Sequence, residues 1–230
     1  MASVALRSVL PDMTSYKLFV VFSYSIVLAA VVGLWRYRKV TPEDRPFFYI
    51  VWTALLGEIL NEVFSAKLHS SAISSNIYVL AEALLYTWQF YNWGSMLRRK
   101  RRFRLLVIFI CMVWVLDNLI LNRLDHTNSL FRIISSFILV FLAIDEINKL
   151  ITTERSSLLT NARFLISAGM VIFFSYKAII EVFYWINLPF SDSFYINVYI
   201  IMDYVNLFVN LIFALAALWI PTRQKFMLPS

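Results

Sequence analysis

Apolar residues run along this chain in long stretches that are separated by short segments rich in polar and charged residues. A transmembrane helix needs about 20 mostly apolar residues to cross about 30 Å of hydrocarbon. We therefore predict seven transmembrane helices, over residues 18–35, 47–67, 73–97, 103–121, 128–150, 162–187 and 194–220. The connecting segments are too short to fold separately. The pattern predicts an all-α fold, a polytopic membrane protein with residues 1–230 in a single domain.

The composition supports a membrane protein. Hydrophobic residues make up 60% of the chain and the mean hydropathy is +0.71, whereas soluble domains contain about 45–50% apolar residues. The net charge of +7 does not indicate nucleic-acid binding, because the basic residues gather at the predicted helix ends and a nucleic-acid site needs a basic face exposed to water. We expect membrane lipid, and no nucleic acid, among the partners.

Lysine and arginine are distributed unevenly between the two sides of the predicted bundle. Fifteen of the 21 basic residues lie in the first, third and fifth loops and in the C-terminal segment. Cytoplasmic loops carry an excess of basic residues. We therefore predict an external N-terminus and a cytoplasmic C-terminus, in a plasma or inner membrane.

Two parts of the chain resemble each other. Residues 76–82 (NIYVLAE) match residues 197–203 (NVYIIMD) conservatively at every position, with the asparagine and tyrosine identical, and residues 62–64 and 181–183 both read EVF. Such matches predict a parallel 3+1+3 repeat, with units at 14–97 and 128–220 and a linker helix at 103–121. The alternative is chance, because apolar helices match one another easily.

The predicted repeat plan, together with the chain length and orientation, resembles that of SWEET-type sugar carriers, PQ-loop transporters and KDEL receptors. The resemblance covers topology across the whole chain and includes no motif. No proline-glutamine pair begins a predicted helix, so no functional residue is transferred from these families.

Polar side chains form single-face stripes on four of the predicted helices. Ionisable residues inside a bilayer are energetically unfavourable and usually face a bundle interior or a water-filled cavity. We expect the stripes to meet in an externally open polar cavity, where Glu82 and Asp203 bind cargo or protons. A carboxyl group at that depth could carry a proton unless Lys177 pairs with it. The candidate ligand- or proton-binding residues are Glu58, Glu62, Glu82, Gln89, Lys177, Glu181, Asp203, Asn206 and Asn210.

Structural roles are the alternative for several of these residues. Asparagine and glutamine in membrane helices often hydrogen-bond to a neighbouring helix, which applies to Asn61, Asn206, Asn210 and Gln89. Glu62 and Glu181 lie close enough to the surface for an interfacial role, and Lys177 could simply neutralise Glu181 one helical turn away. We expect Asp145 and Glu146, at the cytoplasmic end of the fifth helix, to be solvated or to pair with a loop.

The densest basic run is formed by Arg98, Arg99, Lys100, Arg101 and Arg102. One interpretation is a topology determinant. The other is docking of anionic lipid head groups or of an acidic cytoplasmic partner, at about 1 kcal/mol for each basic residue near a charged surface.

The sequence offers little for enzymatic chemistry. His69 and His126 are the only histidines and fall in predicted external loops, so an intramembrane metal site built on several histidines has no ligands. Neither a GxSxG motif nor a phosphate-binding glycine loop occurs. We expect no enzyme activity, no cofactor and no metal.

Three hypotheses for the function follow. The first is a small-solute or proton-linked carrier, in which the cavity binds cargo. The second is a membrane receptor or sensor that signals through a separate cytoplasmic protein. The third is a structural subunit of a membrane complex, whose polar stripes contact other helices.

Overall fold

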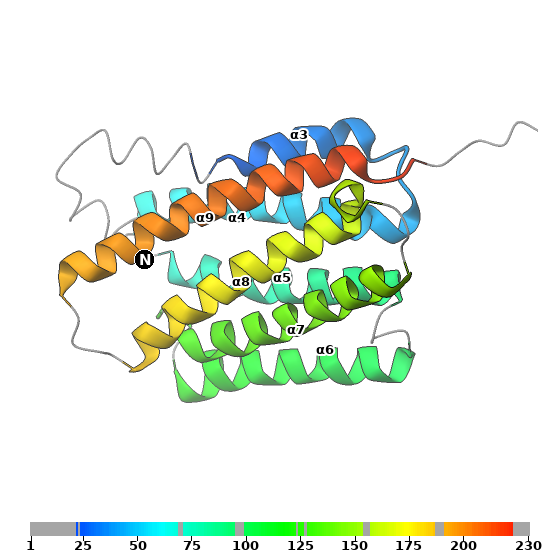
Figure 1. The fold of residues 1–230 in the computed structure, drawn as a ribbon. Helices are drawn as coiled ribbons and strands as arrows, with labels where there is room; N and C mark the ends of the chain where they lie inside the picture. The colour runs from blue at the N-terminus through cyan, green and yellow to red at the C-terminus, as the bar shows by residue number, and fades with distance from the viewer. Residues whose placement is uncertain are drawn as a thin grey trace, which may run out of the picture.

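The computed structural model describes residue 22 and residues 24–68, 71–94, 99–122, 124–126, 128–153, 157–186 and 191–222. Within these residues the fold is all-α, as predicted, and each of the seven apolar stretches overlaps one α-helix (Figure 1). The helices are α3 (Ile26–Arg36), α4 (Arg45–Leu68), α5 (Ala72–Trp93), α6 (Lys100–Val115), α7 (Ser129–Thr153), α8 (Ala162–Ile186) and α9 (Asp192–Trp219).

Local sequence signals explain several helix boundaries. The prediction that the third helix continues to residue 97 is wrong, because Gly94 takes a left-handed conformation with φ of 70° and ends α5; residues 95–97 lie outside the described part. Ser191 begins α9 by accepting a hydrogen bond from the backbone N–H of Phe194 at 3.3 Å. Pro42 opens the short 3₁₀ helix η1 (Pro42–Asp44), which leads into α4.

Six of the helices form a closed ring of neighbours. α3 contacts α4, α4 contacts α5, α5 contacts α7, α7 contacts α8, α8 contacts α9, and α9 returns to α3. Helix α6 lies outside this ring against α5 and α7 (Figure 1). Helix α5 therefore has α4, α6 and α7 around it, which gives its polar stripe partners on several sides.

The two ends of the bundle differ in charge. One end, called the basic end below, holds residues 37–44, Arg99, residues 157–161 and residues 220–222; Arg36 donates hydrogen bonds to the carbonyl oxygens of Leu218 and Ile220 there. The other end, called the opposite end below, holds the α4–α5, α6–α7 and α8–α9 connections.

Within the described residues, four stretches are long and apolar enough to cross a membrane: Pro42–Phe64, Lys100–Leu121, Ala162–Ile186 and Ile196–Trp219. Helix α3 is apolar and spans 11 residues. Large apolar side chains point away from the core, as with Leu34 and Trp35, each 69% exposed. A soluble monomer rarely exposes so much apolar surface, so these features are consistent with a membrane protein.

Aromatic and aliphatic side chains fill the half of the bundle nearer the basic end. Phe47, Phe90 and Met170 are fully buried there, and Phe213 meets the ring of Phe47 edge-on at 5.6 Å between centroids. This apolar layer lies between the basic end and a cavity nearer the middle of the helices.

Candidate ligand-binding cavity

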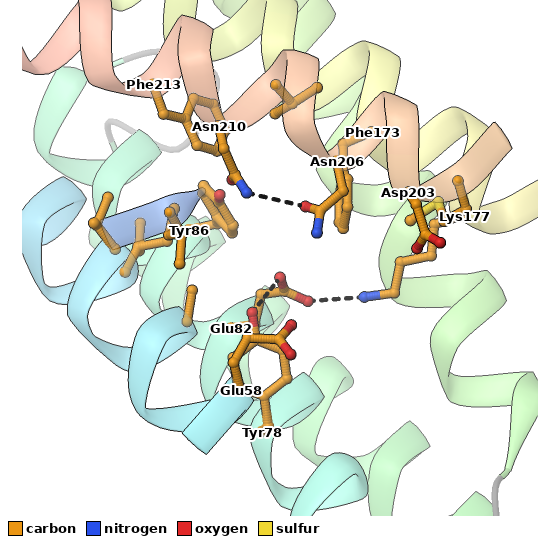
Figure 2. A pocket seen from close by; sticks show the side chains of 16 residues that line it. Glu58, Tyr78, Glu82, Tyr86, Phe173, Lys177, Asp203, Asn206, Asn210 and Phe213 are labelled. Atoms are coloured by element: carbon orange, nitrogen blue, oxygen red, sulfur yellow. Dashed lines mark hydrogen bonds and ion pairs between the residues drawn. The ribbon is translucent and has the colours of Figure 1, made fainter. Parts of the chain in front are cut away.

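A cavity of about 190 Å³ lies between α3, α4, α5, α8 and α9. Figure 2 shows polar side chains from four of these helices pointing into it. The polar lining is formed by Glu58, Tyr78, Glu82, Tyr86, Lys177, Asp203, Asn206 and Asn210. The expected convergence of the polar stripes from α4, α5, α8 and α9 is therefore present.

An ion pair between α5 and α8 forms one wall of the cavity. Lys177 Nζ donates to Glu82 Oε2 at 2.9 Å, and the hydroxyl of Tyr78 donates to Glu82 Oε1 at 3.0 Å (Figure 2). Both oxygens of this carboxylate, which is 6% exposed, therefore have a donor. Burial of a charge is tolerated when it is paired and hydrogen-bonded in this way.

The position of Tyr78 depends on a glycine. A Cβ atom on Gly57 would lie 2.7 Å from the ring of Tyr78, which is closer than non-bonded carbon atoms approach. Glycine at this position of α4 lets the tyrosine ring pack against the helix and reach Glu82 with its hydroxyl.

Two further carboxyl groups line the cavity, those of Glu58 on α4 and Asp203 on α9. Among the residues that the structure describes, no hydrogen bond or ion pair holds either carboxyl group. Among the described lining residues, Lys177 is the single cationic side chain, and it is already paired with Glu82. These residues thus carry three carboxyl groups and one ammonium group.

The side of the cavity nearer the basic end is built from amides and apolar groups. Asn210 Nδ2 donates to Ser25 Oγ on the α3 side at 2.9 Å and to Asn206 Oδ1 at 3.4 Å. Ile26, Val209 and other apolar residues complete this side. The Asn210–Ser25 contact is the interhelical bond expected of an amide in a membrane helix, while the Asn206 side chain remains directed at the cavity.

The nine candidate residues divide into two groups. Glu58, Glu82, Lys177, Asp203, Asn206 and Asn210 all line the cavity. Glu62, Gln89 and Glu181 do not. Gln89 is fully buried and donates to the backbone oxygen of Glu43 at 2.9 Å, near the basic end, so it has the interhelical role that was the alternative for this amide.

The suggestion that Lys177 neutralises Glu181 is wrong. Lys177 reaches across to Glu82, and Glu181 instead lies 3.7 Å from Arg132 on α7. The reason is the rotation of α8, which directs Lys177 toward α5 and the cavity and Glu181 toward α7.

Arg132 is a functional candidate that sequence reasoning missed. Its side chain is 10% exposed and donates from Nη2 to Ser75 Oγ at 2.8 Å and to Asn76 Oδ1 at 3.2 Å. Together with Glu181 it forms a second ion pair, one helical turn along α8 from Lys177 and toward the opposite end. The sequence did contain a sign of this role, because Arg132 lies four residues inside the predicted fifth helix.

A hydrogen-bonded cluster around Asp117 ties the opposite end together. The six-residue π-helix η2 (Leu116–Leu121) continues α6, and fully buried Asp117 on it accepts hydrogen bonds from Asn122 Nδ2 at 2.9 Å and from the backbone N–H of Phe131 at 2.8 Å. Asn128 donates to Asn118 at 3.0 Å. These bonds hold the α6–α7 connection against the start of α7.

A second cluster closes the basic end. Buried Asp44 accepts hydrogen bonds from Trp93 Nε1 at 2.7 Å and from Thr41 at 2.8 Å, and Arg163 lies 3.7 Å from the same carboxylate. Of the two roles expected for Glu146, solvation is wrong, because the residue is fully buried and lies 3.4 Å from Lys149. Lys149 also donates to the backbone oxygen of Trp93 at 2.8 Å, which packs the end of α7 onto α5.

The basic run at the start of α6 remains a candidate docking surface. Arg99, Lys100, Arg101 and Arg102 are exposed, and Arg98 lies outside the described residues. In the described part of the chain, no group of three or more histidine, cysteine, aspartate or glutamate side chains is arranged to hold a metal ion.

Comparisons with known proteins add no identification. No protein-family model matches this chain, and neither a curated protein nor a solved structure shows significant similarity to it.

Proposed function

We propose that this protein is a membrane carrier that binds a small solute in the cavity and links its movement to protons. The observation that supports this most is the pair of carboxyl groups of Glu58 and Asp203. They line a cavity in the middle of the helical bundle, beside an ion pair that already engages the one cationic side chain among the described lining residues. Ionisable groups in such positions mark ion and substrate pathways and proton relays.

The polar stripe of α5 also supports a carrier. Asn76 contacts Arg132 toward the opposite end, Glu82 lies in the cavity, and Gln89 and Trp93 bond to η1 at the basic end. Polar contacts therefore lie along the bundle on both sides of the cavity. In a carrier, polar contacts between helices can break and form again when the binding site opens first to one side of the membrane and then to the other.

The proposal includes seven membrane spans, a cytoplasmic basic end and an external opposite end. Under this orientation fifteen basic residues lie on the cytoplasmic side. The neighbour pattern supports the 3+1+3 repeat, in which α3, α4 and α5 correspond to α7, α8 and α9. The contact α3–α4 then corresponds to α7–α8, and α4–α5 corresponds to α8–α9. The contact between the two units, α3–α9, corresponds to α7–α5. Helix α6, the proposed linker, lies outside this set.

A receptor is the second candidate, favoured by one specific observation. The helices around the cavity are continuous within the described residues, and Gly33, Gly57 and Gly169 are packed against the aromatic rings of Phe48, Tyr78 and Phe213. Glycines in such contacts do not serve as hinges. In a receptor of this kind, the exposed basic residues at the start of α6 would dock the cytoplasmic partner.

Proteoliposomes that contain purified protein and a pH-sensitive dye test the carrier. A mixture of small amines, amino acids and sugars is added outside, and solute-dependent proton movement is measured. We expect such movement in the unaltered protein and a fall of about tenfold or more in Asp203→Asn and Glu58→Gln, equivalent to about 1.4 kcal/mol of lost binding. Asp125→Asn, which removes an exposed loop carboxylate, should leave it unchanged. Solute binding without any proton or solute movement would contradict the carrier and favour the receptor.

A further inference from the structure

The charges in the cavity are unbalanced. Among the described residues, three carboxyl groups line it, and the ammonium group of Lys177 is held by one of them at 2.9 Å. Glu58 and Asp203, on helices α4 and α9, have no basic side chain beside them among these lining residues. In this part of the lining an anionic ligand would meet two carboxyl groups and no free cation, whereas a cationic ligand would meet two carboxyl groups able to accept its hydrogen bonds.

The rest of the lining does not suit a bare metal ion. Ca²⁺ takes six to eight oxygen ligands at about 2.3–2.6 Å, and Mg²⁺ takes about six in a tight octahedron. This cavity measures about 190 Å³. Water occupies about 30 Å³ per molecule in the liquid, so the space is far larger than a single ion requires. Much of its surface is apolar or aromatic, from side chains such as Val51, Phe173 and Phe213.

The cavity already binds one ammonium group, that of Lys177. Besides its contact with Glu82, this group lies 5.5 Å from the ring centroid of Phe173 and 5.3 Å from that of Phe174. A carboxylate together with aromatic faces is a favourable environment for an ammonium ion. Glu58, Asp203, Tyr78 and Tyr86 line the same cavity, which therefore offers further carboxyl groups and aromatic rings to a second ammonium group.

We propose that the ligand of this cavity is a small organic cation, a primary amine with a short hydrocarbon body. Its ammonium group binds between Glu58 and Asp203, and its hydrocarbon body lies against the apolar side formed by Val209 and Phe213. This inference rests on the proposed function, because it names the cargo of the same cavity.

The test compares hexylamine, hexanol and hexanoate, which share a six-carbon body and differ in charge. Binding to the purified full-length protein in lipid nanodiscs is measured by isothermal titration calorimetry at pH 7. We expect hexylamine to bind at least about tenfold more tightly than hexanol, because charge-assisted hydrogen bonds are about twice as strong as neutral ones. Hexanoate should bind more weakly than either. Equal binding of amine and alcohol, or tighter binding of hexanoate, would overturn the inference.

Variants separate binding in the cavity from partition into lipid. Glu58→Gln and Asp203→Asn should each weaken hexylamine binding about tenfold or more, and Asp125→Asn should not change it. Equal loss of hexanol binding in Glu58→Gln and Asp203→Asn would indicate damage to the cavity and count against a charge-specific site. If a variant does not fold, the three-ligand comparison on the unaltered protein still decides the question.

The outcomes also distinguish this inference from the proposed function. Asp203-dependent proton movement with amino acids or sugars, but without selective amine binding, would refute the organic cation and leave the carrier in place. Selective, Asp203-dependent binding of hexylamine without any transport would support the ligand class and refute the carrier.

Discussion

The buried pair of Lys177 and Glu82 makes a quantitative prediction for a double-mutant cycle. The perturbations are Lys177→Met and Glu82→Gln, singly and together. Methionine keeps the length of the apolar stem, and glutamine keeps an oxygen that can accept the Tyr78 hydrogen bond. The two substitutions therefore remove the charges with little change in shape.

The geometry sets the size of the effect. Two unit charges 2.9 Å apart attract by about 6 kcal/mol at an effective dielectric constant of about 20. Much of this is offset by the loss of hydration when both groups are buried. Removal of one partner leaves an unpaired buried charge, which costs about 3–5 kcal/mol of the free energy of unfolding. The double variant leaves no such charge, so we expect a coupling energy of about 2–3 kcal/mol.

The surface pair of Arg163 and Glu43 provides a matched control. Its N–O distance is also 2.9 Å, but its side chains are 29% and 60% exposed, compared with 12% and 7% for Lys177 and Glu82. An exposed pair contributes at most about 1 kcal/mol. Unfolding of both sets of variants is followed in mixed micelles by circular dichroism during titration with a denaturing detergent. A coupling energy in the buried pair no larger than in the surface pair would refute the reasoning.

Three further predictions follow from close contacts and charge. Gly57→Ala forces the Tyr78 ring to move, so we expect a loss of about 1–3 kcal/mol in stability together with weaker ligand binding. The control is Gly33→Ala, which crowds a ring outside the cavity. It should lower stability and leave ligand binding unchanged. Asp117→Ala removes two hydrogen bonds to a buried carboxylate and should lower the free energy of unfolding by about 2–4 kcal/mol; chemical or thermal unfolding measures this loss and those of the glycine variants. A reporter enzyme fused to the C-terminus should be active in the cytoplasm only, and activity on the external side would contradict the proposed orientation.

The helices could be predicted closely because bilayer thickness fixes their length. The stretch predicted at 162–187 is Ala162–Ile186, and the stretch predicted at 194–220 is Asp192–Trp219. One error falls at the end of α5, where one glycine in a left-handed conformation stops an otherwise apolar run. Hydropathy averaged over a window does not register a single backbone angle.

The polar stripes predicted which residues share a helix face, and six of nine candidates do line one cavity. Position along the helix explains one exception. Gln89 is seven residues beyond Glu82, which places it about 10 Å farther along α5 at 1.5 Å per residue. It therefore lies beyond the cavity and meets the backbone of Glu43.

Pairing between helices could not be predicted from the sequence. Lys177 had two possible acidic partners, Glu181 one turn away on α8 and Glu82 on α5. The four-residue spacing allows a pair with Glu181, and the opposite charges allow a pair with Glu82. The choice depends on how α8 is rotated against α5 and α7, which is decided by packing of many side chains. Burial of Glu146 likewise depends on the end of α7 reaching Trp93 through Lys149.

The polar stripe of α5 also sets a condition on biosynthesis. Asn76, Glu82 and Gln89 occupy one helix, and α5 is absent from the stretches that qualify as membrane spans by apolarity among the described residues. A charged residue at the centre of a lone helix opposes release from the translocon into lipid by about 2.5–3.5 kcal/mol. We therefore expect α5 to be retained at the translocon until Lys177 and Arg132, synthesised later in the chain, arrive to shield it. A photo-crosslinker placed in α5 should label the translocon in ribosome-stalled intermediates that end before α7, and this labelling should be lost in those that include α8.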